Sequence, residues 1–465
     1  MNLNVTRMKT KITSLKSLVM TLGLLLTGVL AFGQRSPMQY FRYYDQRGVN
    51  VFETTKVDTV AYDGLKLRIG AGFTQGFQSL NHSNGLTTSS TPAANLYEMA
   101  GGFPLAQANL NIDVQLYDGV SLNLVSYMSS HHHNEFWVKG GYLQIDKVKF
   151  LNSEFMDNLW KNLTLKVGHM EVNYGDAHFR RSDGGQTLWN PWIENNIMDE
   201  FTTEIGAELY FKRNGILGMI GFTDGEIQGT VADPSTPDGA KRKPSLYLKG
   251  GFDKQLSDNL RVRLTGSAMT TKSSASNTLF GGDRTGSNYQ YVMENAPVTL
   301  TGNAFSGRFN PGYRDNVTAF MVNPFVKYGG LEVFGTWEYA FGKNANENGE
   351  GTTWGSKDFT NRQTHQTAGE ALYRFGKNEK FYVGARYIKV TSNLAEGQSV
   401  ASPGTLYDVA IDRTSIAGGW FVTRNILLKA EYVTQKYDGY LPTGANNRFY
   451  QGKFDGIVIQ GAISF

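Results

Sequence analysis

The sequence predicts an all-β fold, a transmembrane antiparallel β-barrel of about sixteen strands with short periplasmic turns and long extracellular loops. Three observations support this prediction. Segments of about ten residues alternate apolar with polar side chains, the connections between them alternate short with long, and the chain ends with Phe465 on an apolar strand face. A strand of about ten residues tilted by about 45° is long enough to cross a bilayer.

The segment from Ala106 to Met128 is the clearest hairpin. Apolar and polar residues alternate on both sides of Asp118-Gly119. This dipeptide favours a two-residue turn, because both central residues of such a turn need a positive φ angle. The alternating polar residues are amides and carboxylates such as Asn111 and Asp113. One face of the hairpin is therefore expected to meet water and the other an apolar phase.

Residues 1 to 33 are predicted to be a signal peptide. A basic region precedes an apolar core from Leu18 to Leu30, and Ala31-Phe32-Gly33 forms a small-x-small cleavage site. An uncleaved signal anchor is the alternative, but the apolar core is shorter than the ~20 residues that a spanning helix needs. We expect residues 34 to 62 to form an N-terminal periplasmic segment and residues 63 to 465 to form the barrel.

The other strands repeat this alternation along the chain. In order, the sixteen segments are expected near 65–73, 106–116, 120–128, 136–145, 163–174, 208–212, 217–222, 246–252, 260–269, 319–328, 331–341, 368–375, 381–390, 410–422, 426–436 and 456–465. Tight turns such as Asn214-Gly215 separate strand pairs, while Lys147 to Lys161 is a longer connection on the same side. A soluble β-sandwich or propeller is the alternative, but it gives no reason for loops to be longer on one side.

The C-terminal residues form an expected assembly signal. Ile457, Ile459, Ile463 and Phe465 fall on one strand face, and Gln460 falls on the other. This pattern resembles the C-terminal signal of outer-membrane barrel proteins, which implies the barrel assembly machinery as a partner.

Composition excludes several classes of function. The 45 basic and 41 acidic residues give a net charge of +4, too balanced to indicate nucleic-acid binding. The absence of cysteine removes disulfides, thiol catalysis and the lipidated cysteine of a lipoprotein. Neither a G-x-S-x-G sequence nor a paired His/acid motif is present, so we expect no enzyme and no cofactor. His131-His132-His133 is expected to be solvated loop, because adjacent histidines do not converge on a metal.

Charged residues on the inward strand faces are expected to line a pore, because a charge on the lipid face near the midplane costs about 2–4 kcal/mol. These pore-lining residues are Asp113, Lys166, Lys249, Arg261, Arg263, Glu332, Glu338, Glu370, Arg374, Arg386, Lys429 and Glu431. Their slight basic excess favours weak anion preference. A wall of mixed charge with no selective site is the alternative.

The connection from Gly175 to about Thr203 is the candidate constriction loop. It is rich in charged and aromatic residues, with His178, Arg180, Arg181, Asp183, Trp189, Trp192, Glu194, Asp199 and Glu200. We expect the Trp pair to pack the loop against the wall and the Arg pair to face Asp183 or Glu194 across the opening. An ordinary surface loop that covers the rim is the alternative.

The middle of the chain resembles a known family. Leu165 to Gly175, LKVGHMEVNYG, resembles a strand of phosphate-selective porin O/P-like proteins, and Glu204 to Leu209 resembles their next strand. Where the family pattern has Pro-Phe before the final Gly, this chain has Asn173-Tyr174. The resemblance implies a sixteen-stranded porin that forms a homotrimer. Phosphate selectivity is not carried over, because a ladder of lumen arginines is not matched residue by residue.

The expected function is an outer-membrane porin, a water-filled channel through which small hydrophilic solutes or ions diffuse without any bond being made. A second interpretation is a barrel that acts as partner or scaffold in an envelope secretion or uptake complex, with Tyr40 to Tyr44 and Thr271 to Asn316 as contact surfaces. A third, a transporter of hydrophobic compounds, needs an apolar lumen, and the polar residues from Asn109 to Gln115 argue against it.

Overall fold

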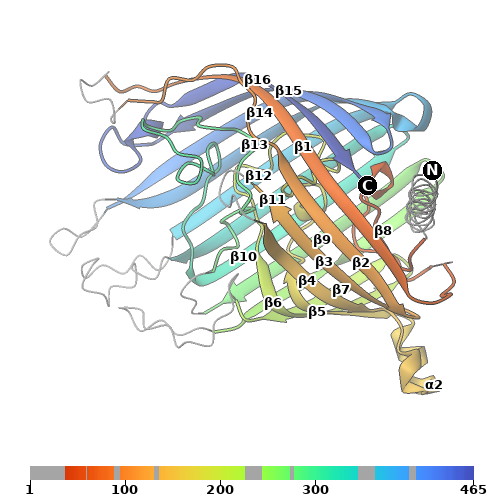
Figure 1. The fold of residues 1–465 in the computed structure, drawn as a ribbon. Helices are drawn as coiled ribbons and strands as arrows, with labels where there is room; N and C mark the ends of the chain where they lie inside the picture. The colour runs from red at the N-terminus through yellow and green to blue at the C-terminus, as the bar shows by residue number, and fades with distance from the viewer. Residues whose placement is uncertain are drawn as a thin grey trace, which may run out of the picture.

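The structure is a computed structural model that describes residues 37–58, 60–87, 95–129, 136–225, 243–272, 277–343, 362–396 and 405–465. Sixteen antiparallel strands form one closed barrel, in which β1 pairs with both β2 and β16 (Figure 1). The predicted fold class and strand number are confirmed. The signal peptide and His131-His132-His133 lie outside the described residues. Within the described ranges, no helix is long and apolar enough to span a membrane.

The strands follow the chain in order around the barrel. Their bounds are β1 (Lys66–Ser83), β2 (Gln107–Tyr117), β3 (Val120–Met128), β4 (Trp137–Ile145), β5 (Leu163–Glu171), β6 (Thr203–Arg213), β7 (Ile216–Thr223), β8 (Ser245–Ser257), β9 (Leu260–Thr271), β10 (Asp315–Tyr328), β11 (Leu331–Lys343), β12 (Arg362–Phe375), β13 (Phe381–Glu396), β14 (Thr405–Thr423), β15 (Ile426–Asp438) and β16 (Lys453–Ser464). The described helices are α2 (Glu154–Trp160) and the short 3-10 helices η1 (Gln46–Gly48), η3 (Lys149–Leu151), η4 (Ala177–Phe179), η6 (Lys377–Glu379) and η7 (Asn447–Phe449).

Several strands end at other residues than the alternation predicts. β1 continues to Ser83, because its backbone stays paired with β16 up to Lys453 after the apolar alternation has faded. β5 ends at Glu171 rather than at Tyr174, because the chain turns into the barrel there and residues 172–176 are buried. Hydrogen-bonded pairing, rather than hydrophobic pattern, therefore fixes the strand ends.

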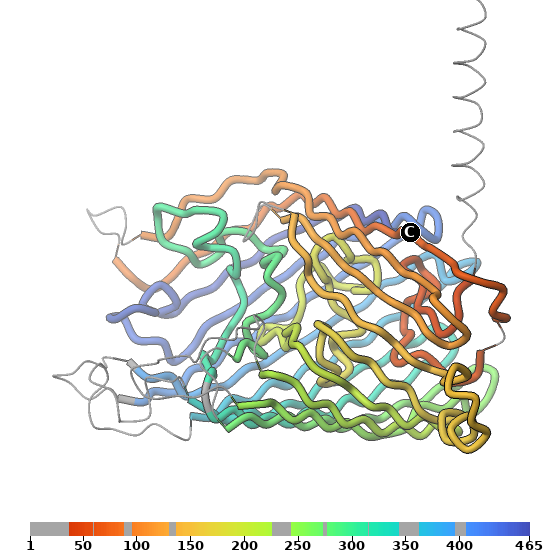
Figure 2. The backbone as a smooth tube through the Cα atoms, turned by 60° about the horizontal axis from the view of Figure 1, so that its bottom comes forward, coloured from red at the N-terminus to blue at the C-terminus, as the bar shows by residue number. Residues whose placement is uncertain are grey.

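Short turns and long connections lie at opposite ends of the barrel. The C-terminus and the first described residues lie at the short-turn end, on the right of Figures 1 and 2. The connection between β4 and β5 is the exception at this end, because it contains η3 and α2. In outer-membrane barrels, the short turns face the periplasm and the long loops face the outside.

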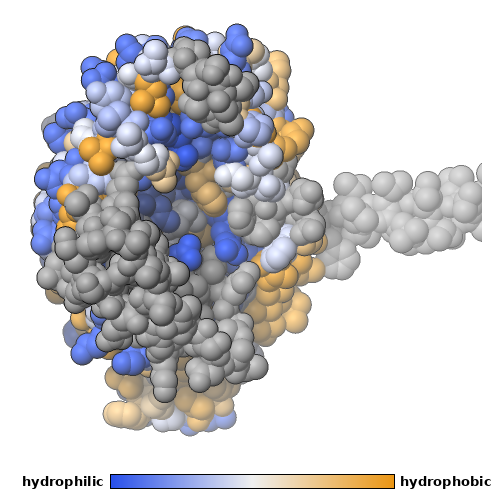
Figure 3. All heavy atoms as spheres, turned by 90° about the vertical axis from the view of Figure 1, so that its left-hand side faces the viewer, coloured by the Kyte–Doolittle hydropathy of each residue, from blue (hydrophilic) through white to orange (hydrophobic). Residues whose placement is uncertain are grey.

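The outer surface of the barrel carries an apolar band. Leu124, Val167, Ile220 and Ile416 lie on outward strand faces and are 39 to 57% exposed. Inward neighbours on the same strands are polar and buried, as Asn111 is on β2. Figure 3 views the long-loop end, where hydrophilic side chains gather around the mouth and hydrophobic ones on an outer flank. An outer face of this kind is suited to lipid.

The turn between β2 and β3 requires glycine. Gly119 has φ +73°, and a Cβ atom there would lie 2.4 Å from the Lys147 Cβ. We expect Gly119→Ala to destabilise the barrel by at least about 1 kcal/mol, because both the backbone angle and the space exclude a side chain. Urea unfolding followed by tryptophan fluorescence measures this. Gly218→Ala is the control, since a Cβ at Gly218 meets no atom within 4 Å; equal losses in the two variants would contradict the prediction.

Candidate functional site

Three segments fold into the barrel. They are the N-terminal segment (residues 37–58), the constriction loop (residues 172–202) and a second inward segment (residues 277–314). Figure 2 shows the tube of the N-terminal segment, in red, within the short-turn end. Trp192 in the constriction loop is 1% exposed, and Met293 in the second inward segment is fully buried. The interior is therefore largely occupied by protein.

The constriction loop crosses the barrel to β1 and β2. Asn109 donates from Nδ2 to the Asp183 carbonyl at 2.8 Å and accepts from the Gly185 amide at 2.9 Å. Thr74 donates to the Gly185 carbonyl at 2.8 Å. Only glycine permits this approach, because a Cβ at Gly185 would lie 2.5 Å from the Cα of Ala108. The loop that leaves β5 is thus fastened to the first hairpin of the barrel.

Later residues of the same loop are held by β13 and β15. Lys429 donates to three loop carbonyls, including that of Trp192 at 2.7 Å. Glu431 accepts from the Ile193 amide at 3.0 Å. Arg386 donates to the Glu194 carbonyl at 2.9 Å and lies 4.9 Å from the Trp192 ring. The charged side chains of this wall are used to hold the backbone of the loop.

A buried four-charge cluster joins the N-terminal segment and the constriction loop to the wall. Lys249 on β8 lies 2.9 Å from Glu53 and 2.8 Å from Asp176. Arg263 on β9 lies 2.7 Å from Glu53 and 2.6 Å from Asp176. Burial acts to raise the pKa of Asp176, but Lys249 and Arg263 outweigh burial and hold the pKa below its ordinary value. Both carboxylates are therefore ionised and matched by two cations.

A second charged cluster involves Arg180 of the constriction loop. Its guanidinium lies 3.3 Å from Glu370 and 3.8 Å from Glu332 and also donates to Asn50. Glu332 accepts from Arg374 at 2.7 Å and from the side-chain Nδ2 of Asn50 at 2.6 Å. Arg180 thus links the loop and the N-terminal segment to β11 and β12.

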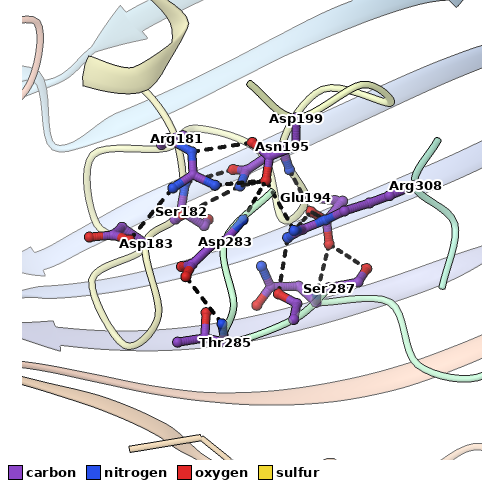
Figure 4. Close-up of polar contacts among 12 residues, drawn as sticks. Arg181, Ser182, Asp183, Glu194, Asn195, Asp199, Asp283, Thr285, Ser287 and Arg308 are labelled. Atoms are coloured by element: carbon purple, nitrogen blue, oxygen red, sulfur yellow. Dashed lines mark hydrogen bonds and ion pairs between the residues drawn. The ribbon is translucent and has the colours of Figure 1, made fainter. Parts of the chain in front are cut away.

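The constriction loop and the second inward segment meet in a network of buried charges (Figure 4). Asp199 lies 2.7 Å from Arg181 and 3.0 Å from Arg308. Arg308 also lies 2.9 Å from Glu194, and Asp283 accepts from the Gly184 amide at 2.7 Å. Burial acts to raise the pKa of Asp199, but the two arginines hold it below its ordinary value. The second inward segment is therefore packed against the constriction loop and is not exposed to solvent there.

Two carboxyl groups meet where the constriction loop touches β11 and β12. Gln366 donates from Nε2 to Glu200 and to Glu338, the latter at 3.4 Å. Tyr174 donates to Glu338 at 3.0 Å. Burial raises the pKa of Glu200 to about 7. This contact is therefore sensitive to pH near neutrality.

A cavity of about 260 Å³ remains between the N-terminal segment, the constriction loop and strands β2 to β6. Three basic side chains among its lining residues are Arg42, Lys166 and Lys212. The ammonium of Lys166 lies 5.1 Å from the Tyr142 ring centre and 5.3 Å from that of Tyr210. Burial lowers the pKa of Arg42 to about 9, which leaves the guanidinium charged at neutral pH. Its lining includes Lys212, near the turn between β6 and β7, and Asp183 and Gln186 of the constriction loop.

The predicted site residues divide into two groups. Of the charged wall residues, Asp113 and Lys166 line this cavity. The others contact inward segments or one another, as Arg261 does by donating to the Asn50 carbonyl at 2.9 Å. Their role in lining a pore stays a prediction. Ile457, Ile459, Ile463 and Phe465 lie on the outer face and are 39 to 49% exposed, and their role in assembly also stays a prediction.

Some expected contacts of the constriction loop differ in the structure. Arg181 lies 3.5 Å from Asp183 within the loop, and Arg180 faces Glu370 on the wall. Trp192 packs against the wall, whereas Trp189 stacks on Arg42 of the N-terminal segment, whose guanidinium carbon is 3.6 Å from its ring centre. His178 donates from Nε2 to the Asn173 Oδ1 at 2.8 Å within the loop.

Several functional candidates were not identified from the sequence. Lys212 shares the inward face of β6 with Glu208 and Tyr210, so the strand alternation indicates that its side chain points into the barrel. Glu53 and Arg42 lie in a segment without periodicity, and no local pattern indicates that it enters the barrel.

Comparisons with known proteins find structural likenesses at low sequence identity. No family model matches the sequence, and no curated protein matches it. The outer membrane channel DcaP of Acinetobacter baumannii is similar in structure, with 11% identity, a TM-score of 0.48, and 87% of this chain and 99% of that chain covered. An anion-selective porin from Comamonas acidovorans has 9% identity, a TM-score of 0.48, and 86% and 100% covered. Outer-membrane expressed OmpT of Vibrio cholerae has 9% identity, a TM-score of 0.45, and 87% and 99% covered.

Proposed function

We propose that this chain is an outer-membrane porin that lets small hydrophilic solutes or ions diffuse passively, with a weak preference for anions. The observation that carries the proposal is the closed barrel with an apolar outer band and a polar interior that retains a cavity along β2 to β6. Such a barrel separates a wet passage from lipid. In this proposal residues 1 to 33 are removed as a signal peptide, the barrel assembly machinery inserts the mature chain, and the barrels form a homotrimer.

The charges that line the cavity support the anion preference. Arg42, Lys166 and Lys212 form no ion pair with a carboxylate among the described residues. Glu53, which also lines the cavity, lies 2.9 Å from Lys249, and Asp183 is paired with Lys139. Asp113 and Glu171 also line the cavity, and neither forms an ion pair with an arginine or lysine among the described residues. The three basic side chains therefore leave a slight positive excess, which favours anions weakly.

Planar-bilayer conductance of the purified, refolded mature protein tests the proposal. We expect stable single-channel steps and, in a salt gradient, a reversal potential of the sign that marks anion preference. Absence of steps from a correctly folded barrel would remove the porin proposal. A reversal potential of the opposite sign would remove the anion preference alone.

Neutralising two cavity lysines is expected to shift this selectivity. In Lys166→Gln with Lys212→Gln, the reversal potential should move toward cation preference, because the passage loses two positive charges that no carboxylate matches. Lys254→Gln, at an exposed position of β8, is the matched control. Equal reversal potentials in the two variants would place the ion path elsewhere. The lysines give a cleaner test than Arg180 and Arg181, whose removal leaves buried carboxylates unpaired.

One observation favours the second candidate, a partner or scaffold role in an envelope complex. Three segments occupy the interior. A filled interior is compatible with a barrel whose role does not require conduction. Residues 277–314, which that role would offer as a contact surface, are instead folded inward among the described residues. If the folded barrel is silent in bilayers, co-purification of a partner from membranes is the next measurement.

A further inference from the structure

The periplasmic connection between β4 and β5 differs from every other described turn at that end. It contains η3 and the helix α2, whereas β6 and β7 are joined by Asn214-Gly215 alone. Figure 1 shows α2 extending away from the barrel wall, at the same end as the short turns. The helix therefore lies beside the barrel rather than across its mouth.

This connection exposes a row of large apolar side chains. Leu151 in η3 is 47% exposed. On α2, Phe155 is 74% exposed and Leu159 is 46% exposed, and these two residues lie four positions apart. Such spacing places side chains on one face of a helix. Phe150, which precedes the helix in η3, is 49% exposed. Apolar groups gathered in this way mark a contact surface.

The connection is held in a defined position. Ser153 caps α2 by accepting from the Met156 amide, and the Trp160 indole donates to the Ile145 carbonyl at the end of β4 at 3.2 Å. Asp157 lies 2.6 Å from Lys149 and so ties the helix to η3. The apolar row is therefore presented to its surroundings by a structured element.

We propose that the face formed by Phe150, Leu151, Phe155 and Leu159 inserts into the periplasmic interface of the bilayer and anchors this rim of the barrel. The strand β5, which follows α2 in the chain and contacts it, carries outward apolar residues such as Val167, which is 43% exposed. Interfacial helices carry aromatic and aliphatic side chains on the lipid side and basic residues beside them. Here the basic residues are Lys149 in η3 and Lys161 directly after α2. Two side chains on the helix α2 and two on η3 are too few for a stable protein interface, which needs about 1,000 Å² in total.

Site-directed spin labelling tests this assignment, since the chain contains no cysteine. Nitroxides are attached to Phe155→Cys, to Glu154→Cys and to Val167→Cys, and each refolded full-length mature protein is placed in phosphatidylcholine vesicles. Glu154 is exposed on a different side of α2 and serves as the water reference. Val167 on β5 serves as the lipid reference, and its label reports whether the barrel has inserted.

We expect the label at Phe155 to collide several-fold more often with oxygen, which concentrates in lipid, than with a water-soluble nickel chelate, as at Val167. The label at Glu154 should show the opposite ratio. A Phe155 label as accessible to nickel as the Glu154 label would place the face in water and overturn the proposal. Protection from both reagents together with spin broadening between copies would identify a second copy of the chain as the occupant and would equally overturn it. Conductance is not part of this readout, so the result is independent of the porin proposal.

Discussion

Asp176→Asn is expected to release the N-terminal segment and the constriction loop from β8 and β9. Asp176 is fully buried, and its carboxylate contacts both Lys249 and Arg263. The substitution keeps the shape of the side chain but leaves Lys249 with the Glu53 carboxylate, and Arg263 with those of Glu53 and Asp253, the latter at 3.3 Å. Removing one partner from a buried ion pair costs about 3–5 kcal/mol, because the other charge stays desolvated. We therefore expect a large loss of stability together with a higher single-channel conductance.

Urea unfolding and planar-bilayer recording measure the two effects of this variant. Asp157→Asn in α2 is the matched control, because its partner Lys149 is 52% exposed and the pair lies outside the barrel. Exposed ion pairs contribute between about 0 and 1 kcal/mol. If both variants unfold at the same urea concentration, the four-charge cluster does not fasten the two segments.

A rise of conductance with pH is the second expected result. Burial raises the pKa of Glu200 to about 7, from an ordinary value of 4.5, so the folded protein holds a proton that the unfolded chain releases. The stability from this proton is fully present below pH 4.5 and is lost as the pH rises through about 7. Above that pH, Glu200 is ionised in a buried position and is repelled by Asp199, whereas its hydrogen bond with Glu338 and the nearby Arg181 favour the ionised form. The constriction loop should then leave β11 and β12.

Recording at pH values from about 5 to about 9 checks this dependence, which should have its midpoint near neutrality. In Glu200→Gln the amide stands for the protonated acid, so conductance should stay at the low-pH level throughout. Glu154→Gln, at an exposed position of α2, should keep the pH dependence of the unaltered protein. A pH profile that is unchanged in Glu200→Gln would assign the effect to another group.

The barrel was predictable because strand alternation is a local property. Val167 and Ile416 face outward and Glu338 and Glu431 face inward, as the period of two requires. Turn residues such as Asn214-Gly215 marked the short-turn end, so strand number and order followed. Strand ends were less predictable, because pairing continues where the apolar pattern stops.

The contents of the barrel were not predictable in the same way. Alternation tells which face Arg263 lies on, but its partners Glu53 and Asp176 come from distant parts of the chain. Tyr289 and Met293 lie in a long connection that reads as surface, yet they are 1% and 0% exposed. Burial there results from packing against the constriction loop and β16, and no local pattern encodes it.

The buried ion pairs also govern how the protein enters a membrane. The Gln46 backbone N–H in the N-terminal segment donates to the Arg424 carbonyl in the turn between β14 and β15. Arg263 forms an ion pair with Glu53 of the same segment. Strands inserted singly would bring Arg263, Glu338 and Glu431 into hydrocarbon without partners, at several kcal/mol for each charge. Insertion, closure of β1 on β16 and folding of the N-terminal segment into the interior are thus parts of one cooperative event. A partly closed intermediate within the bilayer has no low-energy state to occupy.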